Sequence, residues 1–377
     1  MKIIDLTREL IRCYLDRLDN GTQLLYVKKI MAENNIPNRP VEGENLFKKK
    51  WSKLSSDVMV EYYRCFSQYI GADIDILSGN ISVRFIEPIL NPLKYRDYYE
   101  DKNIYGKQFP KNWLPKTYLR NMNGIFMDED YNVIKGFSNK FLSSLVKNVD
   151  RCVIKPTVNS CSGQRVRVFQ RKDEYLLDQY GEILSLEMLL REYRDNFIIQ
   201  ECVEQSEFMA QFNSTSVNTL RIVVYRSVTD NNLYVTNSIL RIGLKDSVID
   251  NAHAGGVFIG IDNNGKLGNV LSNTFGVKQT IFNGINFKEL GYVIPNYNNV
   301  MLFSKNIAQQ IPHHRLIALD IALDSNNNPR LIEYNIGAFS YWLFQFVEQP
   351  ALKGYTDEII DYCKNYKDNI VRNNIVL

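Results

Sequence analysis

The chain has 377 residues, of which 45% are hydrophobic and 23% are charged, values typical of a globular protein and not of a disordered one. Lys and Arg number 45 against 42 Asp and Glu, and the net charge of +3 argues against a general nucleic-acid binder, which is usually more basic. At about 150 residues per domain, the length suggests two or three domains.

The sequence predicts a protein of the cytoplasm. It has no apolar run long enough to span a bilayer, and Asp5, Arg8 and Glu9 interrupt the stretch that a signal peptide would need. The six cysteines form no C-x-x-C pair and show no zinc-finger spacing, so we expect reduced thiols. Only three histidines are present, which excludes a His-rich metal site.

The first hundred residues are predicted to be mostly helical. Apolar residues recur with helical spacing from Ile3 to Leu18, and a second helical pattern spans 58–70. The segment 35–43 contains two prolines and a glycine, and we expect it to connect these helices.

From about residue 130 the pattern changes to short β-rich runs between turn signals. These predicted strands span 152–155, 165–169, 197–203, 220–228, 233–242, 257–261, 316–323 and 330–335. Helices are predicted at 140–147, 184–194, 300–310 and 356–366. The mixture predicts an α+β fold with antiparallel sheet built from hairpins.

A polar loop of small residues follows the first of these strands. Lys155 and Pro156 end the strand, and the loop leads into the strand at 165–169. Small residues let backbone N–H groups approach a phosphate, and the lysine adds a point charge. Taken alone, the pattern favours a plain hairpin with a polar turn.

The last two predicted strands suggest a metal site. If their turn centres on Asn326 and Asn327, Asp320 lies opposite Glu333, and Asn335 shares the face of Glu333. Facing acids repel, and Mg²⁺, which prefers carboxylate and carbonyl oxygens, would remove that penalty. The alternative is a solvent-facing hairpin with exposed acids. The same alternation places the apolar residues on the opposite face: Leu319, Ile321, Leu323, Ile332 and Tyr334.

A third segment, 197–207, is an apolar strand pattern that ends in polar residues. The end of such a strand can present backbone groups to an adenine edge, and an acid there can bind ribose hydroxyls. The alternative is a strand that simply leaves the core.

Together, the Lys–Pro loop, the strand-to-linker segment and the D-x₁₂-E-x-N hairpin resemble the ATP-grasp superfamily, and in particular the sugar-transfer-associated ATP-grasp family, over roughly residues 100 to 345. The resemblance implies an ATP-grasp fold, with two α+β lobes clamping ATP. It implies a helical N-terminal region at 1–100, a first lobe at 101–204 and a second lobe with the metal site at 205–377.

The resemblance also implies roles for individual residues, with ATP and Mg²⁺ as cofactors. The implied catalytic residues are Lys155, against the α- and β-phosphates, and Arg221 and His253, at the γ-phosphate or an acyl-phosphate. The implied metal ligands are Asp320, Glu333 and Asn335. The nucleotide would further contact Asn159, Ser160, Ser162 and Gly163 in a covering loop, Gln200, Glu201 and Val203 around adenine, Glu207 at the ribose, and Lys102 or Lys107 at the entrance.

Two features depart from the patterns of relatives. Ile336, Gly337 and Ala338 follow the metal asparagine where many relatives have a Pro-rich turn, and Ala318 stands where some carboxylate–amine ligases have an arginine. Both departures concern the acceptor side of the site more than the nucleotide side.

The activity implied by the resemblance is ATP-dependent ligation. ATP would phosphorylate a small-molecule or sugar-linked carboxylate, and an amine, or a hydroxyl, would then attack the acyl-phosphate in a pathway of cell-surface polysaccharide biosynthesis. One alternative is a kinase, but no Asp follows Arg315 directly, no D-F-G motif follows and no P-loop motif occurs. The other is a nucleotide-binding protein without catalysis. The oligomeric state stays open.

Overall fold

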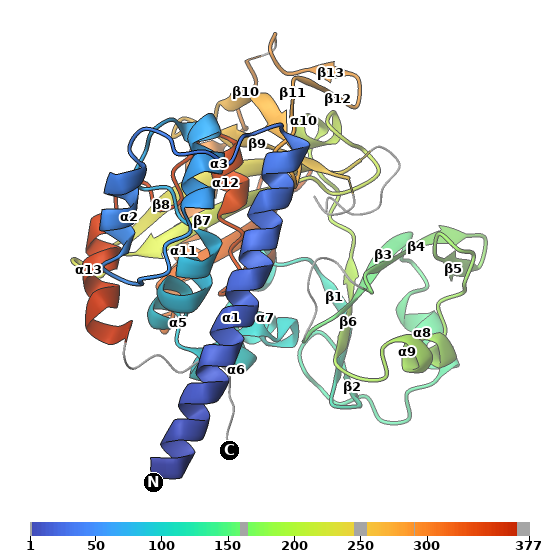
Figure 1. Cartoon of the computed structure of the whole chain (residues 1–377). Coiled ribbons are helices and arrows are strands. Elements are labelled where there is room, and N and C mark those ends of the chain that lie inside the picture. The colour runs from blue at the N-terminus through green and yellow to red at the C-terminus, as the bar shows by residue number, and fades with distance from the viewer. Residues whose placement is uncertain (1, 159–164, 245–254, 290, 368–377) are drawn as a thin grey trace.

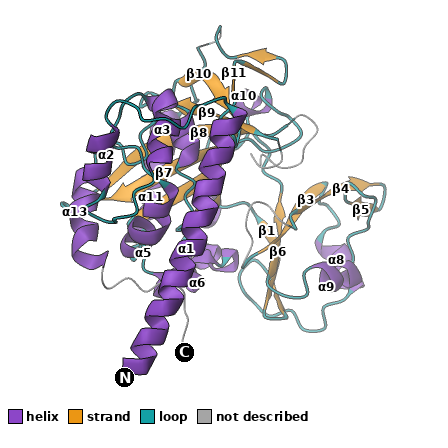
Figure 2. Cartoon of the chain, in the orientation of Figure 1, coloured by secondary structure: helices purple, strands orange, loops and turns teal. Residues whose placement is uncertain are grey.

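The computed structural model describes residues 2–158, 165–244, 255–289 and 291–367. It contains two main β-sheets and a helical N-terminal region (Figures 1 and 2). The first sheet, with two helices beside it, forms a lobe at the right of Figure 1, apart from the larger body that holds the second sheet. This mixture confirms the α+β prediction.

The N-terminal region is a succession of helices and helical turns. Its elements are α1 (Lys2–Glu33), α2 (Glu44–Trp51), α3 (Val60–Ile70), α4 (Gly79–Ile81), a π-helical turn (Ser82–Ile86), α5 (Glu87–Leu90), a 3₁₀ turn (Leu93–Tyr95), α6 (Arg96–Glu100), a 3₁₀ turn (Lys102–Ile104), α7 (Tyr105–Gln108) and a 3₁₀ turn (Lys111–Trp113). The predicted helices at both ends of the connector are confirmed, although α1 runs well past Leu18. Its N-terminal end projects beyond the body in Figure 1.

The first sheet has the strand order β2-β1-β6-β3-β4-β5, with antiparallel neighbours throughout. Its strands are β1 (Thr117–Met122), β2 (Ile125–Met127), β3 (Arg151–Pro156), β4 (Arg167–Lys172), β5 (Tyr175–Leu177) and β6 (Phe197–Glu201). Helices α8 (Asn139–Leu145) and α9 (Leu186–Glu192) share its apolar core through Leu142, Met188 and Leu189.

The second sheet has the strand order β11-β10-β9-β8-β7-β14-β15. Its strands are β7 (Thr219–Arg226), β8 (Leu233–Ile242), β9 (Val257–Ile261), β10 (Leu267–Ser272), β11 (Lys278–Gln279), β14 (Leu316–Leu323) and β15 (Pro329–Asn335). A small hairpin pairs β12 (Ile281–Phe282) with β13 (Ile285–Asn286). The remaining helices are α10 (Glu207–Ala210), α11 (Tyr297–Gln309), α12 (Trp342–Phe346) and α13 (Thr356–Tyr366).

The two faces of the second sheet belong to different apolar cores. Leu319 and Ile321 of β14 join a core with α11, whereas Leu316 and Ala318 join a core with the N-terminal helices, α12 and α13. Because side chains alternate along a strand, Asp320 lies on the face that the N-terminal helices cover. The helical region therefore packs beside the polar part of this face.

Asn91 joins the N-terminal region to the second sheet. Its Nδ2 donates to the carbonyls of Leu316 and Ile336, each at 2.7 Å, and its Oδ1 accepts from the N–H groups of Arg315 and Leu316 at 2.9 and 3.0 Å. Asn91 as a whole residue is 4% exposed. A single amide thus satisfies backbone groups at the start of β14 and just after β15.

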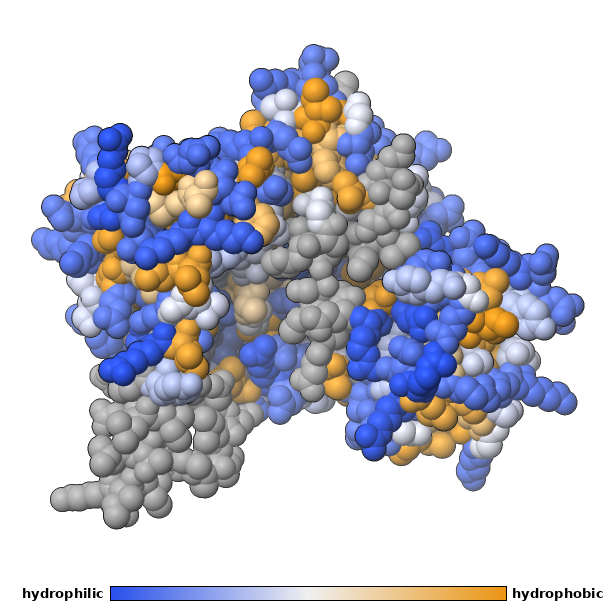
Figure 3. All heavy atoms as spheres, turned by 45° about the vertical axis from the view of Figure 1, so that its right-hand side comes forward, coloured by the Kyte–Doolittle hydropathy of each residue, from blue (hydrophilic) through white to orange (hydrophobic). Residues whose placement is uncertain are grey.

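Within the described residues, no helix combines the length and the apolar character that a membrane crossing requires. On the face shown in Figure 3, apolar residues are scattered among hydrophilic ones.

Candidate active site

The β14–β15 hairpin carries the acidic residues of the site. Asp320 pairs with Glu333 and Ala318 with Asn335, so the predicted register is confirmed. Beyond this point a bulge shifts the register, and Ile321 pairs with Leu331. The bulge makes the prediction for Ile332 wrong, because Leu331 takes its place in the apolar core.

Asp320 is buried and bound by two arginines. Arg221 of β7 pairs with Asp320 in the sheet. It donates from Nε to Oδ1 of Asp320 at 2.5 Å and from Nη2 to Oδ2 at 2.8 Å. Nη1 of Arg241 lies 3.2 Å from Oδ2. Burial alone would raise the pKa of Asp320, but the two guanidinium groups outweigh it and hold that pKa below its ordinary value. Asp320 is therefore a carboxylate at neutral pH.

Arg241 is a site residue that our reading of the sequence missed. It lies in β8, where Ile239 pairs with Arg221, and alternation puts Arg241 on the same face as Ile239. The hairpin register of β7 and β8 is the signal that would have revealed it, because the two strands were predicted with nearly their observed bounds.

Glu333 and Asn335 of β15 are the other two residues predicted to bind the metal ion. The Glu333 carboxylate is partly exposed and lies 3.4 Å from the Lys102 ammonium. Lys107, the other candidate for the entrance, places its Nζ 4.3 Å from the centre of the Tyr131 ring instead. Of the two lysines, Lys102 thus contacts the predicted metal site.

The residues present fit a divalent cation. Asp320 and Glu333 supply carboxylate oxygens, the donors that Mg²⁺ prefers. The buried amide nitrogen of Asn335 has no partner among the described residues, and a rotated amide would put its oxygen in that position. No cluster of three or more His, Cys, Asp or Glu occurs in the described part of the chain.

Lys155 links the two sheets at the site. It ends β3 in the first sheet, and its Nζ donates to the carbonyl of Ile332 in β15 at 3.3 Å. Lys155 as a whole residue is 9% exposed. Burial and the nearby Lys102 ammonium lower the pKa of Lys155 to about 8, although the Glu333 carboxylate opposes this shift.

The predicted adenine residues lie at the end of β6. Gln200 is buried and donates from Nε2 to the hydroxyl of Thr117 at 3.2 Å. The Glu201 carboxylate accepts from the N–H of Lys116 at 2.8 Å and lies 3.3 Å from Arg330 of β15. Glu201 therefore also connects the two sheets.

The other predicted nucleotide residues fall into two groups. Val203 is partly buried after β6, and Glu207 is exposed at the first residue of α10. The remaining predicted residues lie outside the described part of the chain: Asn159, Ser160, Ser162, Gly163 and His253.

The segment after Asn335 adopts a strained backbone beside the N-terminal region. Ala338 and Ser340 have φ values of 53° and 54°, in the left-handed region that favours glycine. The N–H of Ala338 donates to the Glu87 carboxylate at 2.7 Å. The guanidinium of Arg96 lies against Gly337. The departure noted in the sequence thus corresponds to a loop held by residues of the N-terminal region.

Replacing Ala338 by Gly is expected to raise the free energy of unfolding by about 1 kcal/mol, because glycine has no Cβ clash at positive φ. Urea denaturation measures the change. Ala308→Gly in α11 is the control and should lower stability by about 1 kcal/mol or more. A loss of stability in Ala338→Gly would show that the positive φ of Ala338 does not strain the backbone.

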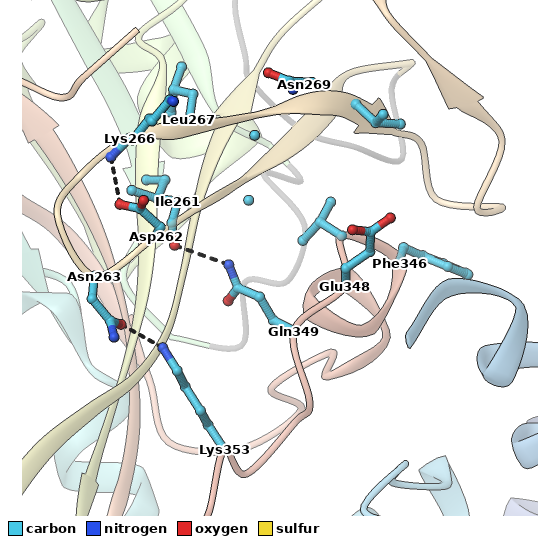
Figure 4. A pocket seen from close by; sticks show the side chains of 14 residues that line it. Ile261, Asp262, Asn263, Lys266, Leu267, Asn269, Phe346, Glu348, Gln349 and Lys353 are labelled. Carbon is cyan, nitrogen blue, oxygen red and sulfur yellow. Dashed lines mark hydrogen bonds between the residues drawn. The ribbon is translucent and has the colours of Figure 1, made fainter. Parts of the chain in front are cut away.

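A separate cavity of about 570 Å³ lies elsewhere on the second sheet (Figure 4). It is lined by the β9–β10 hairpin and by residues after α12, where Gln349 and Lys353 hydrogen-bond to Ile261 and Asn263. It contains none of the residues predicted from the sequence.

The site joins a lysine from one antiparallel sheet to two acids and two arginines on another, an arrangement suited to a phosphorylated, metal-bound ligand. The sequence matches the model of the sugar-transfer-associated ATP-grasp family over residues 82–360. The match covers well over half of the chain, so the chain belongs to this family and has the ATP-grasp fold.

Solved structures of ligases and of a synthetase resemble the chain at low identity. The ATP-grasp ligase PsnB, complexed with a phosphomimetic variant of minimal precursor, Mg and ADP, is 12% identical with a TM-score of 0.39, over 73% of this chain and 61% of PsnB. The D-alanine-D-alanine ligase from Coxiella burnetii is 8% identical with a TM-score of 0.40, over 74% and 61%. The D-cycloserine synthetase DcsG is 11% identical with a TM-score of 0.39, over 75% and 74%.

The chain thus spans about three fifths of the length of PsnB and of the D-alanine-D-alanine ligase. No curated protein matches the sequence.

Proposed function

We propose that the protein is an ATP-dependent ligase that activates a carboxylate as an acyl-phosphate and transfers it to an amine. The observation that carries the proposal is the contact between Lys155 of the first sheet and the strand that bears Glu333, opposite Asp320. Membership of the sugar-transfer-associated family supports a sugar-linked carboxylate and a role in cell-surface polysaccharide synthesis. We place this role in the cytoplasm as part of the proposal.

The proposed reaction has two steps. A carboxylate oxygen of the substrate attacks the γ-phosphorus of ATP, and ADP leaves as the acyl-phosphate forms. The amine nitrogen then attacks the acyl carbon, releases inorganic phosphate and forms an amide, with loss of a proton. A hydroxyl nucleophile would give an ester in the same way.

The residues of this chain would position and neutralise the phosphates. Lys155 would contact the α- and β-phosphates, and Arg221 would stabilise the charge that develops at the γ-phosphate. Asp320, Glu333 and Asn335 would hold Mg²⁺, which neutralises phosphate charge when bound. Lys102, close to Glu333, would approach the phosphates from the N-terminal side.

We also propose the nucleotide-side assignments. Gln200, Glu201 and Val203 would border the adenine, because they lie where β6 ends between the two sheets. Glu207 would contact the ribose. Residues 101–204 and 205–377 would form the two lobes, with 1–100 beside the acceptor.

An ADP-release screen tests the function. Sugar acids are crossed with amino acids, and products are identified by mass spectrometry. A ligase releases ADP and free phosphate, whereas a kinase releases ADP and retains the phosphate on its product. ADP binding without turnover over the whole panel would instead favour a binding protein.

ADP affinity is expected to weaken as the pH rises through about 8, because Lys155 loses its proton there while phosphates bind the protonated form. Calorimetric titration with ADP on both sides of this pH measures the effect. Lys155→Arg stays charged and should flatten the profile. An equally steep profile in Lys155→Arg would assign the dependence to another group.

A further inference from the structure

Asp320 is enclosed by cations. Both of its carboxylate oxygens accept from Arg221, and Arg241 lies beside Oδ2. Its side chain is 3% exposed. Since a buried carboxylate needs partners, the two arginines satisfy it without a metal ion.

The whole site carries an excess of positive charge. Two carboxylates, Asp320 and Glu333, are surrounded by four cationic side chains: Lys102, Lys155, Arg221 and Arg241. A divalent cation approaching this set would be repelled, and it would find the Asp320 oxygens already bonded. A polyphosphate reverses both conditions, because it brings negative charge and new acceptors for the guanidinium groups.

We propose that Arg221 and Arg241 block metal binding at Asp320 in the nucleotide-free protein. The polyphosphate of the nucleotide draws these arginines away, so that the metal ion binds together with the nucleotide and not before it. This inference rests on the proposed function, since it requires that ATP binds at this site. It gives Arg241 two roles, as a partner of Asp320 in the free protein and as a phosphate ligand in the complex.

Binding of Mn²⁺, followed by the electron paramagnetic resonance signal of the free ion, tests this order. Without nucleotide, the wild-type protein should show no tight Mn²⁺ site, and with ADP it should bind the ion. Arg241→Gln should bind Mn²⁺ without nucleotide on the order of tenfold more tightly than the wild type, and should bind ADP on the order of tenfold more weakly.

Arg64→Gln is the matched control. Arg64 also makes a two-bonded pair with a carboxylate, that of Glu44, at 2.7 and 2.8 Å, but it does so among the N-terminal helices. This variant should leave both affinities unchanged. A parallel gain in Mn²⁺ binding would show that loss of any arginine suffices, and would overturn the inference.

The outcomes separate this inference from the proposed function. If ADP does not bind to the wild type, the proposed function fails. If ADP binds but Arg241→Gln leaves Mn²⁺ binding unchanged, only the metal order fails. Should Arg241→Gln not fold, the wild type decides: a tight nucleotide-free Mn²⁺ site that Glu333→Gln removes would refute the order, and its absence would support it.

Discussion

Glu333→Gln is expected to abolish ATP turnover while the protein stays folded. The carboxylate is partly exposed and faces Asp320 across the hairpin, so its loss removes one of the two anionic metal donors that we propose. An amide of the same shape keeps the packing. We expect a fall in ADP release of about a thousandfold or more, from the loss of charge stabilisation around the phosphates.

The comparison for this variant is Glu348→Gln. Glu348 also lies beside a lysine, Lys278, at 3.5 Å, but in the loop after α12. This control should release ADP at the wild-type rate, and melting temperatures should confirm that both variants are folded. Near-wild-type ADP release by Glu333→Gln would mean that the metal assignment is wrong.

Asn91→Asp is expected to lower the free energy of unfolding by about 3 kcal/mol or more. The substitution replaces the amide nitrogen, which donates to the carbonyls of Leu316 and Ile336, by an oxygen that both carbonyls repel. The site is buried, so water cannot compensate. Urea denaturation monitored by circular dichroism measures the loss.

Asn273→Asp is the control, because it makes the same chemical change from asparagine to aspartate at another position. The Asn273 oxygen accepts from the N–H groups of Phe275 and Val277, and aspartate can keep both bonds. We expect a change within about 0.5 kcal/mol. Equal losses in the two variants would show that the pairing of Asn91 with the sheet contributes little.

The hairpin of the proposed metal site could be predicted in detail because its pairing depends on local sequence. An Asn-rich turn and strict alternation set the pairing of Asp320 with Glu333. The bulge that places Leu331, and not Ile332, in the apolar core could not be predicted in this way. A residue that bulges out of the strand pairing leaves no mark in the amino-acid composition of the strand.

The first strand of the first sheet, β1, was also not predicted from the sequence. Strand β1 contains Arg120 and Asn121, both buried, and polar residues hide the strand pattern. The contacts of the N-terminal region were unpredictable for another reason: Asn91 and Glu87 act on residues more than two hundred positions later. No local pattern reports such pairing.

The packing of the N-terminal helices on the second sheet also constrains how the chain folds during synthesis. Asn91 is made 225 residues before Leu316, one of its partners. At about 5–20 residues per second, a ribosome needs roughly 10 to 45 seconds to cover that interval. During this interval, Phe47 and Phe66 of the helices lack the later members of their shared apolar core, such as Phe344 and Phe346 of α12. The helical segment is thus made before the second sheet and can complete its packing only after that sheet has been made.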